Sequence, residues 1–282
     1  KNIKKDSLGS LIPNFLINKY LQKLLEKRKN IFSIESEIID FQSDDNFISI
    51  LLSNKKKIKA SLAIGADTRF SYARSKMGIS SFTKDFKKNM IVCRMKIENI
   101  HNNIAYEFFK YKKTLALLPY VNNEASIIIT DTKINTERLL KLKTKDFNSE
   151  VEKNFNLFFG KMHLIGKRYS YPMITVYSKK FISNRFALIG DAAVGMHPVT
   201  AHGFNLGLQG IEILTKEIKS AIKNNIDIGS NFVLNKFQYK LHLTAIPLYL
   251  ATNSIVQLYT NTSRPSKIAR KFALRAVNTI KP

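Results

Sequence analysis

Residues 190–205 read GDAAVGMHPVTAHGFN, and this stretch joins a predicted strand to a predicted helix. The short apolar run Arg185–Ile189 is typical of a buried strand, and Gly203–Ile222 has the apolar periodicity of a helix. Asp191 therefore stands at the carboxyl end of a strand, where open α/β sheets bind their ligands. An ordinary strand–loop–helix connection with an aspartate at its turn is the alternative interpretation.

The residue types in this loop suit a bound ligand. Ala192 is small enough to pack closely beside one, and Gly203 lets the backbone approach it. The amides of Phe204 and Asn205 would open the following helix, where unpartnered N–H groups and the helix dipole favour negative charge. The Asp191 carboxylate can accept hydrogen bonds from the hydroxyl groups of a polyol.

A second stretch, residues 62–79, reads LAIGADTRFSYARSKMGI. A strand-like run from Ile58 to Ile64 leads into the small residues Gly65 and Ala66 and then into Asp67. Taken alone, this pattern indicates a turn after a strand and nothing more.

Both stretches resemble motifs of the aromatic hydroxylase flavoproteins. The first is similar to the family's second FAD fingerprint, GDAAH-x-x-x-P-x-x-G-x-G-x-N, and the second to its middle motif, GADG-x-x-S-x-V-R-x-x-x-G-I. Val194 stands where many members have His, and Ala201 and Thr68 stand where many have Gly. With smaller matches at Leu115–Pro119 and at Arg168–Pro172, the chain most resembles the ubiquinone-biosynthesis hydroxylases of the UbiH and UbiF type, and among them the UbiM-like branch.

The resemblance implies which residues bind FAD. In the first motif it assigns Asp191 to the ribityl chain and places the rest of the loop around the flavin ring: Gly190, Ala192, Pro198, Gly203, Phe204 and Asn205. In the second motif it places Gly65 and Asp67 at the pyrophosphate region, and Arg74 as the anchor of the turn. It assigns no catalytic acid or base. No metal site is expected, because His197 and His202 have no Asp, Glu or Cys nearby to complete a ligand set.

The remaining patterns, together with the resemblance, predict an α/β fold with an α+β substrate domain. We expect residues 1–80 to end the first segment of a Rossmann-like FAD domain and residues 81–180 to form an antiparallel substrate-binding sheet. Residues 181–230 would return to the FAD domain, and residues 231–282 would form a helical tail interrupted near Pro247 and Pro265. A helix over Asn14–Lys29 and strands over Ile31–Phe41, Phe47–Ser53 and Ile58–Ile64 are predicted in the first segment.

The family pattern begins with a strand and a G-x-G-x-x-G turn that binds the pyrophosphate. No such string occurs in these 282 residues. We therefore expect the FAD domain to lack its N-terminal βαβ unit, and whether these residues bind FAD without it is open.

The resemblance implies an FAD-dependent monooxygenase that hydroxylates the aromatic ring of a polyprenylated ubiquinone precursor through a flavin C4a-hydroperoxide. O2 and NAD(P)H would be consumed, and other ubiquinone-biosynthesis proteins would be its partners. Two alternatives stay open: another FAD-dependent oxidoreductase of the prenyl reductase type, and a non-catalytic partial chain.

The formal net charge of +25 invites a nucleic-acid interpretation. We expect none, because the Lys residues are spread along the chain and the longest run, Lys55–Lys57, is typical of a hairpin turn. We expect a cytoplasmic protein that attaches peripherally to the inner face of a membrane, because the polyprenylated substrate implied by the resemblance resides in the bilayer and no apolar run approaches the length of a span. Apolar residues of the tail would make that contact, or would instead pack against both domains: Leu241, Leu243, Ile246, Leu248, Leu250, Ile255, Val256 and Leu258.

Overall fold

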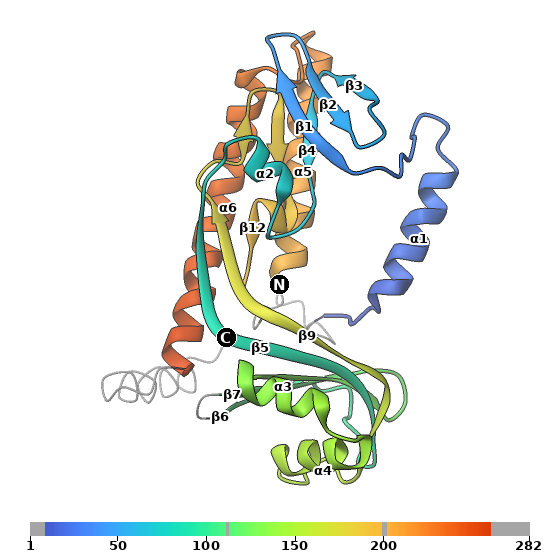
Figure 1. Cartoon of the computed structure of the whole chain (residues 1–282). Coiled ribbons are helices and arrows are strands. Elements are labelled where there is room, and N and C mark those ends of the chain that lie inside the picture. The colour runs from blue at the N-terminus through green and yellow to red at the C-terminus, as the bar shows by residue number, and fades with distance from the viewer. Residues whose placement is uncertain (1–8, 111–112, 199–201, 261–282) are drawn as a thin grey trace, which may run out of the picture. The chain divides into compact units, whose positions relative to one another are not determined.

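A computed structural model describes residues 9–110, 113–198 and 202–260 (Figure 1). Its described residues divide into two compact units. One comprises the chain up to Glu35 together with Asn89–Tyr171, and the other comprises Ser36–Lys88 together with the chain from Pro172 onward. Both units combine helices with strands, so the fold is mixed α/β as predicted.

The second unit contains two small sheets. Strands β1 (Ile38–Ser43), β2 (Ile48–Leu52) and β3 (Lys57–Ala60) form an antiparallel meander, drawn in blue in Figure 1. Strands β10 (Ile182–Ser183), β11 (Phe186–Leu188) and β4 (Ala63–Gly65) form the other sheet, in which β11 and β4 are parallel.

Two predicted strands of this region have different limits in the structure. The run predicted as one strand from Ile58 to Ile64 is divided between two sheets, because the chain bends at Ser61 between β3 and β4. The strand predicted over Ile31–Phe41 begins at Ile38, and the residues before it form no regular element. Phe32 is 84% exposed, so the apolar pattern of this run does not reflect burial.

Helices complete the second unit. The short helix α2 (Tyr72–Lys76) follows β4, and a 3-10 turn η1 (Gly190–Ala192) and strand β12 (Val194–Gly195) follow β11. Helices α5 (His202–Lys223) and α6 (Asn231–Thr260) run alongside each other (Figure 1). An ion pair between Glu217 and Lys240, with 2.5 Å between Oε1 and Nζ, joins these two helices.

The predicted interruption of the tail at Pro247 is wrong, because α6 continues through this residue. The predicted break at Pro265 lies outside the described residues. Of the apolar residues in this part of α6, Leu241 and Val256 are buried, whereas Leu243 and Leu250 are each 59% exposed. The tail therefore contributes both to the core and to the surface.

The first unit contains α1 (Asn14–Glu26), which buries none of its residues, and most of a six-stranded sheet of order β12-β9-β5-β8-β7-β6. Its strands are the 17-residue β5 (Ser81–Ile97) and β9 (Met162–Ser178), with β6 (Tyr106–Lys110), β7 (Lys113–Pro119) and β8 (Glu124–Thr132). Helices α3 (Lys133–Lys141) and α4 (Thr144–Asn154) complete it. Cys93 lies in the apolar core, and burial raises the pKa of its thiol to about 12.

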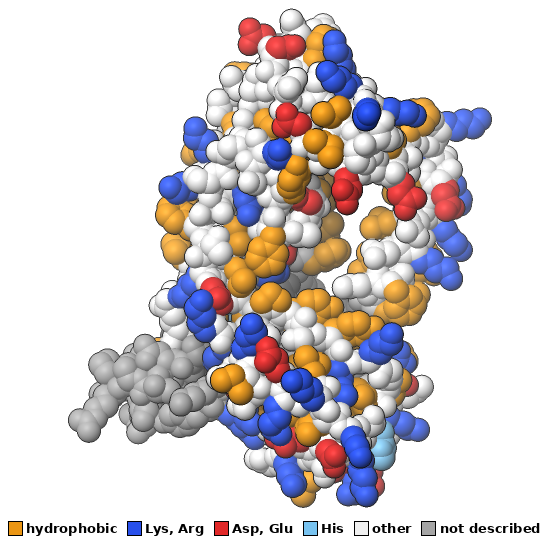
Figure 2. All heavy atoms as spheres, in the orientation of Figure 1, with side chains coloured by type: hydrophobic (Ala, Val, Ile, Leu, Met, Phe, Trp, Pro, Cys, Tyr) orange, Lys and Arg blue, Asp and Glu red, His pale blue; other side chains and the backbone are white. Residues whose placement is uncertain are grey.

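The charge distribution on the face seen in Figure 2 agrees with the one expected from the sequence. Figure 2 shows Lys and Arg side chains scattered over the viewed face instead of gathered into one patch. Among the described helices, none is both long and apolar enough to cross a membrane.

Candidate functional site

The parallel strands β4 and β11 position the two sequence motifs. Ala63, Ile64 and Gly65 pair in register with Phe186, Ala187 and Leu188. Because parallel strands end at the same edge of a sheet, the turns that carry Asp67 and Asp191 lie next to each other. This edge is where open α/β sheets bind ligands.

Gly65 permits the close packing of this strand pair. A Cβ atom at Gly65 would lie 2.7 Å from Cζ of Phe186 and 2.9 Å from Cδ2 of Leu188, and both side chains are fully buried. These distances leave no room for a larger residue, so the glycine is required by packing within the sheet.

The carboxylate of Asp67 binds the start of α2. Its Oδ1 accepts a hydrogen bond from Oγ of Ser71 at 2.5 Å, and its Oδ2 accepts one from the Ala73 amide at 3.3 Å. Ser71 is the N-cap, and its hydroxyl oxygen accepts from the Arg74 amide. Thr68, which replaces the family's glycine, has no positive φ, and its hydroxyl accepts from the Phe70 amide. The turn therefore forms without a glycine at this position.

Arg74 joins the two motif turns. Its Nη1 donates to the carbonyl of Ala192 and its Nη2 to the carbonyl of Arg69, both at 2.9 Å. The side chain is buried, and this burial lowers the pKa of the guanidinium while the nearby Asp67 opposes the shift. Both hydrogen bonds come from a charged donor and are stronger than neutral ones.

The Asp191 turn is short and closely packed. Gly190 adopts a φ of +60°, which favours glycine, and Ala192 is completely buried. The Ala192 carbonyl also accepts a hydrogen bond from Oγ of Ser178 on β9. The side chain of Asp191 is 37% exposed, so it faces accessible space beyond the strand end.

Arg69 binds Asp191, a contact that the sequence analysis did not identify. Its Nη2 and Nε lie 2.7 and 3.1 Å from Oδ2 of Asp191, and its Nη1 donates to the carbonyl of Ile174 at 2.8 Å. The only signal in the sequence is a basic residue two positions after Asp67, which is not distinguishable from an exposed turn residue.

The other predicted site residues lie at the start of α5 or just before it. Pro198 is exposed, and α5 begins at His202, so the amides of Gly203, Phe204 and Asn205 belong to its first turn. Such amides lack acceptors within the helix and favour negative charge. Gly207, also missed from the sequence, lies close to the turn: a Cβ there would be in ordinary van der Waals contact with Cα of Gly190, at 3.5 Å.

His197 is buried beside this loop. Its ring contacts Phe86 edge to face, with the ring centroids 4.9 Å apart. Burial, reinforced by the charges of Lys88, Arg69 and Lys84, lowers the pKa of the imidazole to about 4. The ring is therefore neutral at physiological pH. Among the described residues, no group of His, Cys, Asp and Glu side chains could hold a metal ion.

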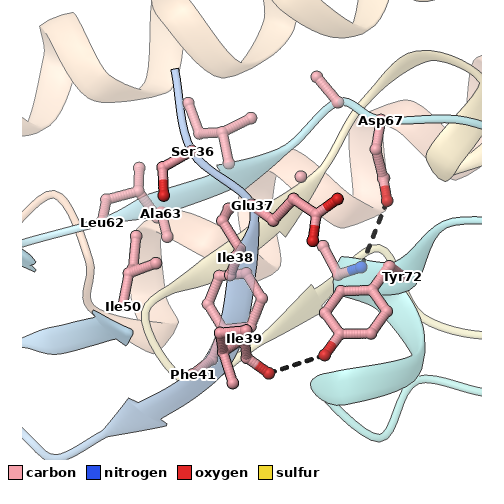
Figure 3. Close-up of a pocket in the computed structure, with 14 residues that line it drawn as sticks. Ser36, Glu37, Ile38, Ile39, Phe41, Ile50, Leu62, Ala63, Asp67 and Tyr72 are labelled. Carbon is pink, nitrogen blue, oxygen red and sulfur yellow. Dashed lines mark hydrogen bonds between the residues drawn. The ribbon is translucent and has the colours of Figure 1, made fainter. Parts of the chain in front are cut away.

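A cavity of about 820 Å³ lies along β4 (Figure 3). Its wall is mostly apolar and includes Ile38, Phe41 and Ile50 from the meander, and Asp67 lies at its margin with its carboxylate turned toward α2. The hydroxyl of Tyr72 donates to the carbonyl of Ile39 at 2.7 Å and fixes β1 against α2. The cavity offers apolar packing surface and few polar partners.

The chain is similar to known proteins over most of its length. Residues 11–227 match the sequence pattern of the FAD binding domain family. The chain is 39% identical over 280 residues to ubiquinone hydroxylase UbiM of Neisseria meningitidis, covering 98% of this chain and 60% of that protein. It is 30% identical over 235 residues to ubiquinone hydroxylase UbiL of Rhodospirillum rubrum, covering 83% and 55%.

The chain thus spans little more than half the length of these relatives. Among solved structures, it is similar to PqsL of Pseudomonas aeruginosa, described as a probable FAD-dependent monooxygenase. The TM-score is 0.69 at 15% identity, covering 86% of this chain and 68% of that one. At this identity the likeness concerns the fold alone.

Proposed function

The chain belongs to the FAD binding domain family, and on that premise we propose that the protein is an FAD-dependent monooxygenase that hydroxylates the aromatic ring of a polyprenylated ubiquinone precursor. The observation that carries the proposal is the position of Asp191. It extends from the carboxyl end of β11, beside the Asp67 turn of the parallel strand β4, and Arg74 joins the two turns.

The residues of this site fit FAD. The half-exposed carboxylate of Asp191 would accept hydrogen bonds from the ribityl hydroxyls, with Gly190 and Ala192 leaving room beside it. The first-turn amides of α5, from Gly203 to Asn205, would face the electron-rich edge of the flavin. The small residues of the loop would allow the ring to approach the backbone.

The second motif would support the cofactor indirectly. Gly65 allows β4 and β11 to pack, Asp67 orders α2 near the pyrophosphate, and Arg74 holds both turns in place. Pro198 would limit the movement of the loop over the ring. The bound flavin would supply the activation of O2, and the residues of this chain would orient it and exclude water.

The substrate class rests on the relatives. UbiM and UbiL are named ubiquinone hydroxylases, and relatives named ubiquinone biosynthesis monooxygenase occur in several eukaryotes. We propose NAD(P)H as the electron donor. Other ubiquinone-biosynthesis proteins would be its partners. No described side chain is assigned as a general base.

A reaction with labelled O2 tests this function. The full-length natural protein, supplied with FAD, NADH and a short-chain prenylated phenol, should insert one labelled oxygen atom into the aromatic ring, as detected by mass spectrometry. Asp191→Ala should lose FAD affinity by about 1.5–3 kcal/mol, the range for a hydrogen bond to a charged group. A reduced prenyl chain without inserted oxygen would instead indicate a reductase, and unchanged FAD affinity in the variant would remove Asp191 from the site.

We also propose that the protein is cytoplasmic and binds the inner face of a membrane, where a polyprenylated substrate would reside. From Leu241 to Thr260, α6 contains no charged residue, and Leu243, Ile246 and Leu250 are exposed on it. The net charge of +25 would add attraction to anionic lipids, which salt weakens. Flotation with anionic and neutral vesicles at two salt concentrations tests this: the protein should float with anionic vesicles at low salt, and its absence from every vesicle fraction would contradict the proposal.

A further inference from the structure

Arg69 uses all three nitrogen atoms of its guanidinium group within the site. Two of them bind one oxygen of the Asp191 carboxylate, Oδ2, and the third binds the carbonyl of Ile174 on β9. No described residue hydrogen-bonds the other oxygen, Oδ1. The arrangement therefore fixes the carboxylate by one oxygen and leaves the second without a hydrogen-bond partner among the described residues, on a side chain that is 37% exposed.

The position of Arg69 is itself determined by neighbouring residues. Its backbone carbonyl accepts a hydrogen bond from Nη2 of Arg74. Gly195 on β12 makes room for its side chain, because a Cβ at that position would lie 2.9 Å from Cβ of Arg69. Three separate segments thus hold this arginine against Asp191, which is more than an exposed surface ion pair requires.

We propose that Arg69 is the positioning residue of the flavin site: it holds Asp191 by Oδ2 so that Oδ1 can accept a hydrogen bond from the ribityl chain of the cofactor. The inference rests on the proposed function. The side chain of Asp191 is more than one-third exposed, so without Arg69 it would rotate among several staggered conformations. Binding FAD would then require ordering that carboxylate, which costs conformational entropy.

The test is a double-mutant cycle for FAD affinity in the full-length protein, measured by quenching of flavin fluorescence. Arg69→Gln should weaken FAD binding by about tenfold or more, as expected when hydrogen bonds to a charged group are lost. Arg69→Lys, which can restore one hydrogen bond and the charge but not the fork, should recover part of that loss. In the Asp191→Asn background, Arg69→Gln should have little further effect, because the two residues act as one unit.

Arg138→Gln is the matched control. It removes another arginine–carboxylate pair, Arg138–Glu150 at 2.9 Å between α3 and α4, and should leave FAD affinity unchanged. Additive effects of the Arg69 and Asp191 substitutions would overturn the inference, since Arg69 would then act on the cofactor independently. The inference would also be overturned if the Arg69→Gln variant melts at a lower temperature but binds FAD as tightly as the wild type. If Asp191→Asn alone leaves FAD affinity unchanged, the proposed flavin site itself fails.

Discussion

Replacing Arg74 with methionine should separate the two motif turns. Methionine retains much of the apolar stem of arginine but provides no donor for the carbonyls of Ala192 and Arg69. The arginine is 8% exposed, so water cannot easily replace the lost bonds. With 1.5–3 kcal/mol for each hydrogen bond to a charged group, and partial relaxation of the turns, we expect a loss of about 2–4 kcal/mol in unfolding free energy. For a chain of this size, the melting temperature should fall by roughly 3–7 °C.

The same substitution should weaken flavin binding, because the turn that presents Asp191 is no longer held against the Asp67 turn. Arg168→Met is the control. Arg168 also donates two hydrogen bonds to backbone carbonyls, those of Leu139 and Leu142 at 2.8 and 2.9 Å, but it lies in the other unit. Thermal denaturation and flavin titration of both variants in the full-length protein provide the comparison. The reasoning is refuted if both variants lose stability and both bind flavin as tightly as the wild type.

Three other predictions concern packing, pH and the surface. Gly65→Ala should lower the unfolding free energy by about 1–3 kcal/mol, as overpacking does, while Gly203→Ala, whose Cβ would have no atom of the described residues within 4 Å, should not; urea denaturation compares them. Because the pKa of His197 is lowered to about 4, its contribution to stability is present near neutral pH and is lost as the pH falls toward 4. Between pH 7.5 and pH 5, the unfolding free energy of the wild type should therefore fall by about 2 kcal/mol more than that of His197→Gln. Equal decreases in the two proteins would contradict this assignment. Leu250→Lys should reduce flotation with neutral vesicles, because Leu250 is exposed. Leu241 is buried, so Leu241→Lys should have a smaller effect on the flotation of the protein that still folds.

Much of the local structure could be predicted from the sequence. The Gly190–Asn205 string indicated a strand, a tight turn and a helix, and β11, η1 and α5 have that order. This succeeded because each element is specified by residues close together in the chain: an apolar run, small residues with a glycine at positive φ, and a helical apolar period. Periodicity failed where burial did not follow the pattern, as at Phe32. The expectation that a proline interrupts a helix failed at Pro247, which lies within α6.

By itself, the sequence determined the two motifs and their family, and it predicted which residues would face the flavin. Only the tertiary structure decided how the motifs are joined. Arg69 and Asp191 are 122 positions apart, and Arg74 and Ala192 are 118 apart. No local pattern encodes such contacts, because they arise when β4 and β11 pair in parallel and bring two distant turns to one edge of the sheet. The same pairing explains why Gly65 cannot be larger: its neighbours, Phe186 and Leu188, belong to the other strand.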